Sequence, residues 1–221
     1  MSLTNNYLKL KQIIPEGVEF VAVSKQQSTI SIQELYNLGQ RIFGENRVQE
    51  LVAKYEQLPK DIEWHMIGNL QTNKVKYIAP FISLIQSVNN IKLLDEINKH
   101  AIRNNRIINC LLEVHIASEL SKSGFSVQEI ADLYEDEIPE KFTNVNIKGL
   151  MGMATYTDNM RTILNEFKTL TNLYTLIKEK HKKNYPDYKI ISIGMSGDYH
   201  LALKAGSTMV RIGSYLFNNE Q

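Results

Sequence analysis

Short apolar runs alternate with longer stretches of helical periodicity along the whole chain. Between the runs, apolar residues recur at helical spacing. The runs themselves lack the strict alternation of a half-exposed sheet, which indicates parallel strands that are buried on both faces. The predicted strands are 18–24, 41–45, 62–68, 81–88, 107–116, 146–153, 189–194 and 208–213, and the predicted helices are 31–39, 46–58, 70–78, 91–104, 127–135, 159–182 and 198–205.

The regular order of strand and helix predicts a parallel α/β fold. About eight such units in 221 residues favour a single (β/α)8 barrel of the TIM type, and we expect an extra helix at the N-terminus. An open, doubly wound sheet is the alternative that the pattern leaves. No linker or low-complexity segment interrupts the chain, so residues 1–221 are expected to form one domain.

Composition and charge exclude several classes of function. The chain has 25 basic and 24 acidic residues, so its net charge of +1 gives no general attraction to nucleic acid or to a membrane surface. No apolar run reaches the roughly 20 residues of a membrane-spanning helix, and no signal peptide is visible. The single cysteine, Cys110, lies in an apolar run and is expected to be a buried, inert thiol. A cytoplasmic protein is therefore expected.

The last two predicted strands are each followed by a cluster of glycine and serine. The first cluster contains Ser196, and the second contains Gly213 and Ser214. In TIM barrels, phosphate groups commonly bind in the loops after strands seven and eight. Glycines let backbone N–H groups approach an anion, and serine hydroxyls add donors. The two clusters predict a phosphate site, with ordinary turn chemistry as the alternative.

Two cationic residues lie at the same end of the predicted barrel. Lys25 closes the first strand, where partial burial would lower the pKa of its amine and make it a nucleophile toward a carbonyl. Arg211 precedes Gly213 on the same face of the last strand. A buried arginine needs a partner, which is either a pyridine nitrogen or a carboxylate such as Glu45 or Glu113. The combination fits either pyridoxal phosphate or, in an aldolase, a phosphorylated carbonyl substrate.

Several motifs together resemble one family. They are "VAVSK", "FGENRVQE", "WHMIGNLQTNK", "SKSGF", "KGLMGM", "IGMSGD" and "AGSTMVRIGSYLF", and they extend over nearly the whole chain. In this order they resemble the pyridoxal phosphate homeostasis proteins, whose fold is the barrel domain of alanine racemase. This chain departs from the family pattern at Asn69, which is usually proline, at Gly197, which is usually acidic, and at Ser214, which is usually threonine.

The resemblance implies a role for each motif residue. Lys25 is expected to form a Schiff base with pyridoxal 5'-phosphate, and Arg211 to face the pyridine nitrogen. Asn46 would lie beside the ring. The phosphate would be held by Ser196, Gly213 and Ser214. His65 also matches its motif, but the residues alone indicate only a satisfied histidine at a strand end.

The resemblance also implies a binding protein that maintains intracellular pyridoxal phosphate, rather than an efficient enzyme. An arginine cannot give its proton to the ring nitrogen, because its pKa exceeds about 12. Recipient apo-enzymes are possible partners. The chain ends at Gln221, soon after the last predicted strand. We therefore expect it to lack the second racemase domain and to be a monomer. The alternative is a slow racemase-like enzyme with Tyr156 and Tyr199 as candidate acids.

Two further features of the sequence bear on possible sites. His100, Glu113 and His115 do not form a metal-ligand pattern, so no metal is expected. The loop 119–125, which contains Lys122 and Ser123, follows the fifth predicted strand, and it either approaches a ligand or is a plain turn.

Overall fold

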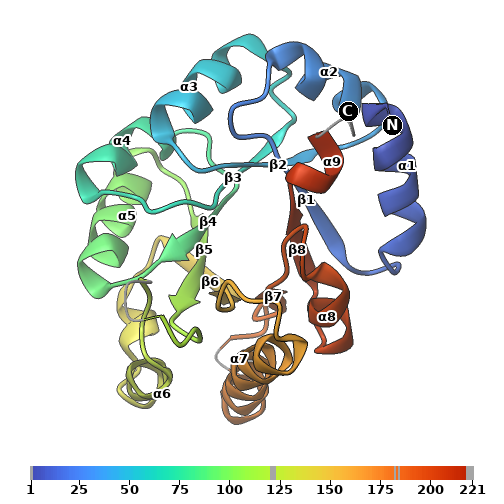
Figure 1. Cartoon of the computed structure of the whole chain (residues 1–221). Helices are drawn as coiled ribbons and strands as arrows, with labels where there is room; N and C mark the ends of the chain where they lie inside the picture. Colours follow the sequence, from blue (N-terminus) through green and yellow to red (C-terminus); the bar gives the residue numbers. More distant parts are fainter. Residues whose placement is uncertain (1, 120–122, 182, 184, 218–221) are drawn as a thin grey trace.

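A computed structural model describes residues 2–119, 123–181, 183 and 185–217. Eight parallel strands close into a barrel in sequence order, with helices around the outside (Figure 1). The closure is direct, because the first and last strands pair in register, with Ala22 opposite Ile212. The (β/α)8 barrel is therefore confirmed, and the open sheet is excluded. The strands are β1 Glu19–Val23, β2 Ile42–Glu45, β3 Glu63–Met66, β4 Leu84–Val88, β5 Ile108–Val114, β6 Val145–Gly152, β7 Ile190–Ser192 and β8 Met209–Ile212.

The helices follow the strands as the periodicity predicts, with local differences. The predicted helix 70–78 is split into a 3-10 turn and a short α-helix, and a further helix begins at Ser214 directly after β8. The helices are α1 Leu3–Ile13, α2 Thr29–Asn37, α3 Val48–Gln57, α4 Val75–Ile78, α5 Ile91–Arg103, α6 Val127–Glu135, α7 Met160–Lys180, α8 Tyr199–Lys204 and α9 Ser214–Phe217, and the 3-10 helices are η1 Thr72–Lys74 and η2 Ile138–Lys141.

The core has two parts that the barrel wall separates. Between the strands and the helices lies a large apolar layer. Inside the barrel is a small cluster of apolar side chains: Val21, Leu84, Leu111, Met151 and Met209. The half-buried Met153, directly after β6, packs against this inner cluster, so Met151 and Met153 both fill the barrel as expected. The interior is thus packed and supports the residues at the ends of the strands.

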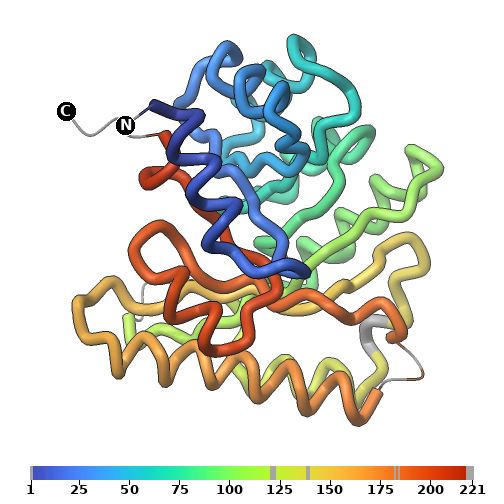
Figure 2. Tube along the Cα trace, turned by 90° about the vertical axis from the view of Figure 1, so that its right-hand side faces the viewer, coloured from blue at the N-terminus to red at the C-terminus, as the bar shows by residue number. Residues whose placement is uncertain are grey.

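The expected N-terminal helix is α1, which packs against α9 at the end of the barrel wall. Ser2 caps it by accepting a hydrogen bond from the backbone N–H of Asn5. The Asn6 amide donates to the carbonyl of Leu216 at 3.2 Å, which ties α1 to α9. Figure 2 shows the two ends of the described chain side by side. In the described ranges, no helix combines the length and apolar character that crossing a membrane requires.

Candidate functional site

The two glycine–serine clusters meet in the structure. The Oγ of Ser196 accepts hydrogen bonds from the backbone N–H groups of Gly213 and Tyr215, both at 3.2 Å. Backbone donors at the start of α9 therefore converge on the loop after β7. This arrangement of N–H groups and a hydroxyl can bind a phosphate oxygen. Ser214 is exposed at the rim of the same cradle.

Gly213 brings the end of β8 close to the end of β1. A Cβ atom at this position would lie 3.1 Å from both the Cβ and the carbonyl oxygen of Val23. Lys25 follows two residues after Val23, so its chain segment lies beside the cradle. The Lys25 side chain is exposed and makes no hydrogen bond or ion pair within the described ranges. The partial burial expected for Lys25 is therefore wrong for the free protein, although its position next to the cradle fits the expected role.

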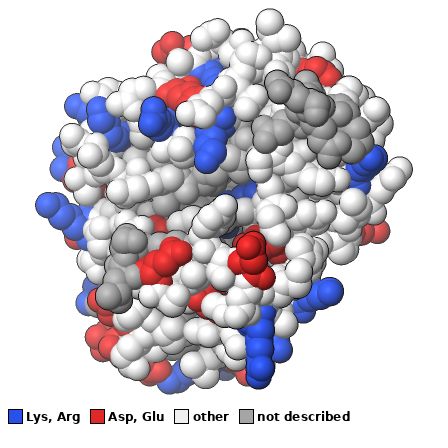
Figure 3. All heavy atoms as spheres, viewed as in Figure 1, with Lys and Arg blue, Asp and Glu red and all other residues white. Residues whose placement is uncertain are grey.

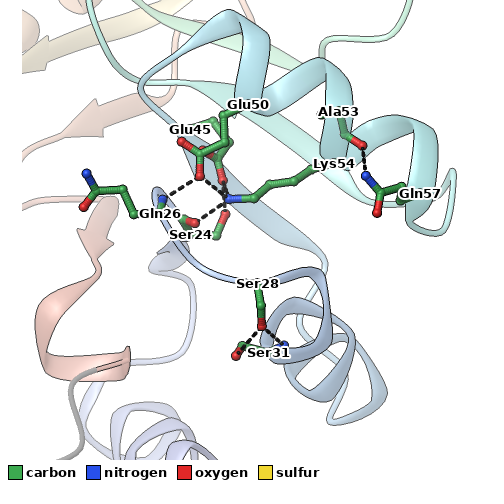
Figure 4. Close-up of polar contacts among 9 residues, drawn as sticks. All are labelled: Ser24, Gln26, Ser28, Ser31, Glu45, Glu50, Ala53, Lys54 and Gln57. Atoms are coloured by element: carbon green, nitrogen blue, oxygen red, sulfur yellow. Dashed lines mark hydrogen bonds and ion pairs between the residues drawn. The ribbon is translucent and has the colours of Figure 1, made fainter.

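The backbone on both sides of Lys25 is held by a buried ion cluster from β2 and α3 (Figure 4). Lys54 donates to the carbonyl of Ser24 at 2.7 Å, directly before Lys25. On the other side, the N–H of Gln26 donates to Oε1 of Glu50 at 2.5 Å. Gln26 has a positive φ of 63°, which a non-glycine residue adopts only when its surroundings hold it there. The cluster thus fixes the turn that carries Lys25.

Lys54 is the centre of this cluster. Its amine pairs with Glu45 at 2.7 Å and with Glu50 at 2.6 Å, while the Ser24 hydroxyl donates to Glu45 at 2.6 Å. The side chains of Lys54 and Glu45 are 6% and 0% exposed. Burial raises the pKa of Glu45, and the hydrogen bonds from Lys54 and Ser24 oppose that rise. Lys54 therefore compensates a carboxylate that has no access to water.

Arg211 is buried below the cradle and is already well paired. Its Nη1 donates to the carbonyl of Ser192 at 2.8 Å and to the Ser192 hydroxyl at 2.6 Å, and its Nη2 donates to the carbonyl of Gly152 at 3.0 Å. Burial lowers the pKa of Arg211 to about 10, while the charges of Asp198 and Glu113 act in the opposite direction. The guanidinium thus stays charged at neutral pH. The expected alternative partners, Glu45 and Glu113, form no ion pair with it in the described structure.

A chain of hydrogen bonds continues from Arg211 into the barrel. The Ser192 hydroxyl donates to Oε1 of Gln86 at 2.7 Å, and the Gln86 amide lies 3.0 Å from Nδ1 of His65. Burial lowers the pKa of His65 to about 3, so the ring is neutral and Nδ1 accepts. His65 is therefore an interior residue, and its link to the mouth is indirect, through Gln86 and Ser192.

Asn46 lies where β2 leaves the barrel, at the mouth of the fold. Gly68 makes room for it, because a Cβ at Gly68 would lie 2.5 Å from the Asn46 carbonyl oxygen. Asn46 is half-buried and lines a cavity of about 630 Å³ between the ends of β2 and β3. The structure thus brings Asn46 to the same face as Lys25 and the cradle, as expected.

The structure also shows the surroundings of the other residues that the sequence analysis considered. Cys110 is buried, and burial raises the pKa of its thiol, so it is inert as predicted. Among the described residues, no three His, Cys, Asp or Glu side chains are grouped to hold a metal ion. Ser123 donates to the buried Glu113 carboxylate at 3.1 Å, which ties the loop after β5 to the mouth. The neighbouring Lys122 lies outside the described residues.

Sequence reasoning missed the residues that support the site from behind. Lys54 follows Glu50 by four residues on a helix, which is the usual spacing of an exposed ion pair. The available signal was Glu45, a charge at the end of a strand predicted to be buried. Gln86 and Ser192 were hidden in the same way, since each is a polar residue within a short strand that is otherwise mostly apolar.

Comparisons with known proteins identify the family. Residues 1–220 match the alanine racemase N-terminal domain. The pyridoxal phosphate homeostasis protein of Aquifex aeolicus is 37% identical over 92% of this chain and 87% of its own length. That of Helicobacter pylori strain 26695 is 39% identical over 90% of this chain and 87% of its own length.

Solved structures of similar fold point to the same family. PipY of Synechococcus elongatus, with PLP bound, has a TM-score of 0.87 and 28% identity, and the match covers 98% of this chain and all of PipY. An alanine racemase of Clostridium difficile shares the fold at a TM-score of 0.77 and 14% identity, and this chain spans 56% of its length. The chain therefore belongs to the pyridoxal phosphate homeostasis protein family, which is built on the N-terminal barrel of alanine racemase.

Proposed function

We propose that this protein holds pyridoxal 5'-phosphate as a Schiff base on Lys25 and acts in intracellular pyridoxal phosphate homeostasis. The observation that carries the proposal is the pairing of β1 with β8. This pairing brings an exposed lysine, with no partner of its own in the described structure, beside a cradle of backbone N–H groups and a buried arginine. The PLP-bound structure of PipY supports the same cofactor.

The residues present fit this cofactor. The cradle offers the Ser196 hydroxyl and the N–H groups around Gly213 to a phosphate, and the missing side chain of Gly213 keeps the approach open. Arg211 uses three hydrogen bonds of the five that a guanidinium can donate, which leaves donors for a ring nitrogen. Asn46 would complete the site beside the ring.

The chain's own groups favour holding the cofactor over driving catalysis. When bound, the cofactor would supply an aldehyde, and Lys25 would provide the amine that is nucleophilic toward it. Arg211 keeps its proton at neutral pH, because its pKa of about 10 is still well above 7. It therefore gives a ring nitrogen a hydrogen bond but no proton, which leaves the ring a weak electron sink. Sequestering a reactive aldehyde on one defined lysine would protect other amines in the cell.

The proposal also includes the cellular location, the oligomeric state and the partners of the protein. We place the protein in the cytoplasm as a monomer whose residues 1–221 act as one domain, and recipient apo-enzymes would be its partners. The buried, free thiol of Cys110 fits a reducing compartment. Light scattering coupled to gel filtration measures the oligomeric state, and a dimer would contradict this part.

The decisive experiment is an absorption titration of the purified protein with pyridoxal phosphate, followed by borohydride reduction and peptide mapping. We expect a visible band and one reduced adduct, on Lys25. Lys25→Ala should abolish the adduct while weak, reversible binding through the phosphate remains. Lys204→Ala, on the exposed end of α8, is the matched control and should change nothing. A reducible adduct that persists in Lys25→Ala would refute the assignment.

A slow racemase-like activity is a second candidate, favoured by the position of Tyr199. This residue begins α8 beside the cradle, and its ring faces Tyr215 at 6.3 Å between centroids. Tyr156, the other candidate acid, is 97% exposed. Exchange of the α-proton of amino acids in deuterated water tests the candidate. Protons retained throughout a panel of amino acids would exclude it.

A further inference from the structure

The polar cavity that Asn46 lines opens beside the proposed cofactor site. Its volume is about 630 Å³, and it lies between the start of α3 and the turn before α4. Lys and Arg gather on this part of the face, over α3 and α4, as Figure 3 shows. The lining is almost entirely polar: Asn46, Arg47, Val48, Gln49, Glu50, Asn69, Gln71 and Lys74.

The charges in the cavity are unbalanced. Arg47 and Lys74 contribute two positive charges, and neither forms an ion pair within the described ranges. Glu50 is the acid of the lining, but its Oε1 is already bonded to Lys54 and to the N–H of Gln26. Arg47 also stands at the N-cap of α3 without capping it, so the first N–H groups of this ten-residue helix add partial positive charge. The cavity thus favours a small anion.

The cavity shares one wall residue, Glu50, with the turn that carries Lys25. Glu50 is part of its wall and also holds the N–H of Gln26, the residue after Lys25. Asn46 lines the cavity and is also the residue expected beside the cofactor ring. The cradle at Ser196 and Gly213 belongs to other loops, those after β7 and β8. An anion in the cavity would therefore be separate from the cofactor phosphate, and it would share the Glu50 wall with the turn that carries Lys25.

We propose that this cavity binds the carboxylate of a small 2-amino acid, whose amine displaces Lys25 from the cofactor. This inference rests on the proposed function. In the exchange, the unprotonated amine of the amino acid would attack the carbon of the protonated imine and form a new C–N bond. The bond to Nζ of Lys25 breaks, and Lys25 takes the proton that the incoming amine loses. No oxidant, reductant or water is consumed, so amino acids would unload the cofactor from the protein.

The test compares two amines that differ only in the carboxylate. Cofactor-loaded protein is mixed with L-alanine or with ethylamine, and the cofactor released is separated by gel filtration and quantified. The ratio of the two rates reports the carboxylate, and comparing variants cancels the difference in basicity between the amines. Arg47→Gln and Lys74→Gln should each lower the ratio about tenfold, because each removes a charge-assisted hydrogen bond. Lys76→Gln is the matched control, since Lys76 is an exposed neighbour outside the lining and should leave the ratio unchanged.

A second measurement needs no cofactor. Sodium acetate is titrated into the cofactor-free protein at constant ionic strength, and the amide resonances of Val48 and Gln49 are followed by NMR. We expect saturable shifts that Arg47→Gln and Lys74→Gln weaken. Unshifted amides would overturn the anion site, and a rate ratio that neither variant changes would overturn the amino-acid assignment. A protein that shows no visible band with pyridoxal phosphate would instead refute the proposed function, while the acetate titration would still decide the site.

Discussion

Replacing Lys54 with methionine tests the buried ion cluster most directly. The substitution keeps most of the length of the side chain but removes the charge that Glu45 and Glu50 share, and it leaves the Ser24 carbonyl with the N–H of Gln27 as its donor. Breaking a buried pair by removing one partner costs about 3–5 kcal/mol, because the other charge stays buried without compensation. For a chain of this size that corresponds to a fall in Tm of roughly 10 °C.

The loss of stability in Lys54→Met should also depend on pH. Without Lys54, the pKa of Glu45 should rise further, because burial then acts with less opposition. A carboxyl whose folded pKa lies above its unfolded value contributes stability below the unfolded pKa of about 4.3, and that stability is lost as the pH rises through the folded value. The loss in free energy of unfolding caused by Lys54→Met should therefore be larger at pH 8 than at pH 5.

The assay is urea unfolding at both pH values. The double variant Glu45→Gln/Lys54→Met should regain part of the loss, since the neutral amide can still accept from the Ser24 hydroxyl. A single variant that loses less than about 1 kcal/mol would refute the reasoning, because removal of a compensating buried charge costs more than that. A loss that is equal at pH 5 and pH 8 would show that Glu45 is not the group left uncompensated.

Three further predictions concern the barrel interior and the cradle. Ser192→Ala removes a hydroxyl that Arg211 contacts at 2.6 Å, so the visible spectrum of the loaded protein should shift while folding, followed by circular dichroism, is retained. Gly213→Ala places a Cβ 3.1 Å from Val23, and such overpacking costs about 1–3 kcal/mol, so the affinity for pyridoxal phosphate should fall in a fluorescence titration. His65 has a folded pKa of about 3, below its unfolded value, so the stability it contributes is present above about pH 6.5 and is lost as the pH falls toward 3. Between pH 4 and 7, the free energy of unfolding should therefore depend less on pH in His65→Gln than in the original protein. An unchanged dependence on pH would show that another group titrates.

The barrel was predictable because its signals are local. Each strand is a short apolar run and each helix an amphipathic stretch, and their order alone indicates the topology. Helix α9 was missed because Gly213 and Ser214 are typical of a turn. Its helical turn forms where backbone N–H groups of Gly213 and Tyr215 meet the Ser196 hydroxyl, which is 17 residues before Gly213 in sequence.

The supporting residues could not be predicted, because their partners lie far apart in sequence. Lys54 contacts the Ser24 carbonyl 30 residues away, and Ser192 contacts Gln86 across 106 residues. A buried lysine on α3 has the same local pattern as an exposed one. The exposure of Lys25 was also unexpected, because its environment depends on how the turn at Gln26 directs the chain, and that turn is held by Glu50.

The pairing of β1 with β8 sets a condition on when the site can exist during synthesis. Lys25 leaves the ribosome early, whereas the cradle and Arg211 are among the last parts of the barrel to be made. A partly synthesised chain would carry the reactive amine without the phosphate site, and a lone exposed lysine has little affinity for the aldehyde. Under the proposed function, retention of the cofactor would require that the final strand has docked on the first, with Ala22 opposite Ile212. Cofactor loading would thus report that a newly made molecule has closed its barrel.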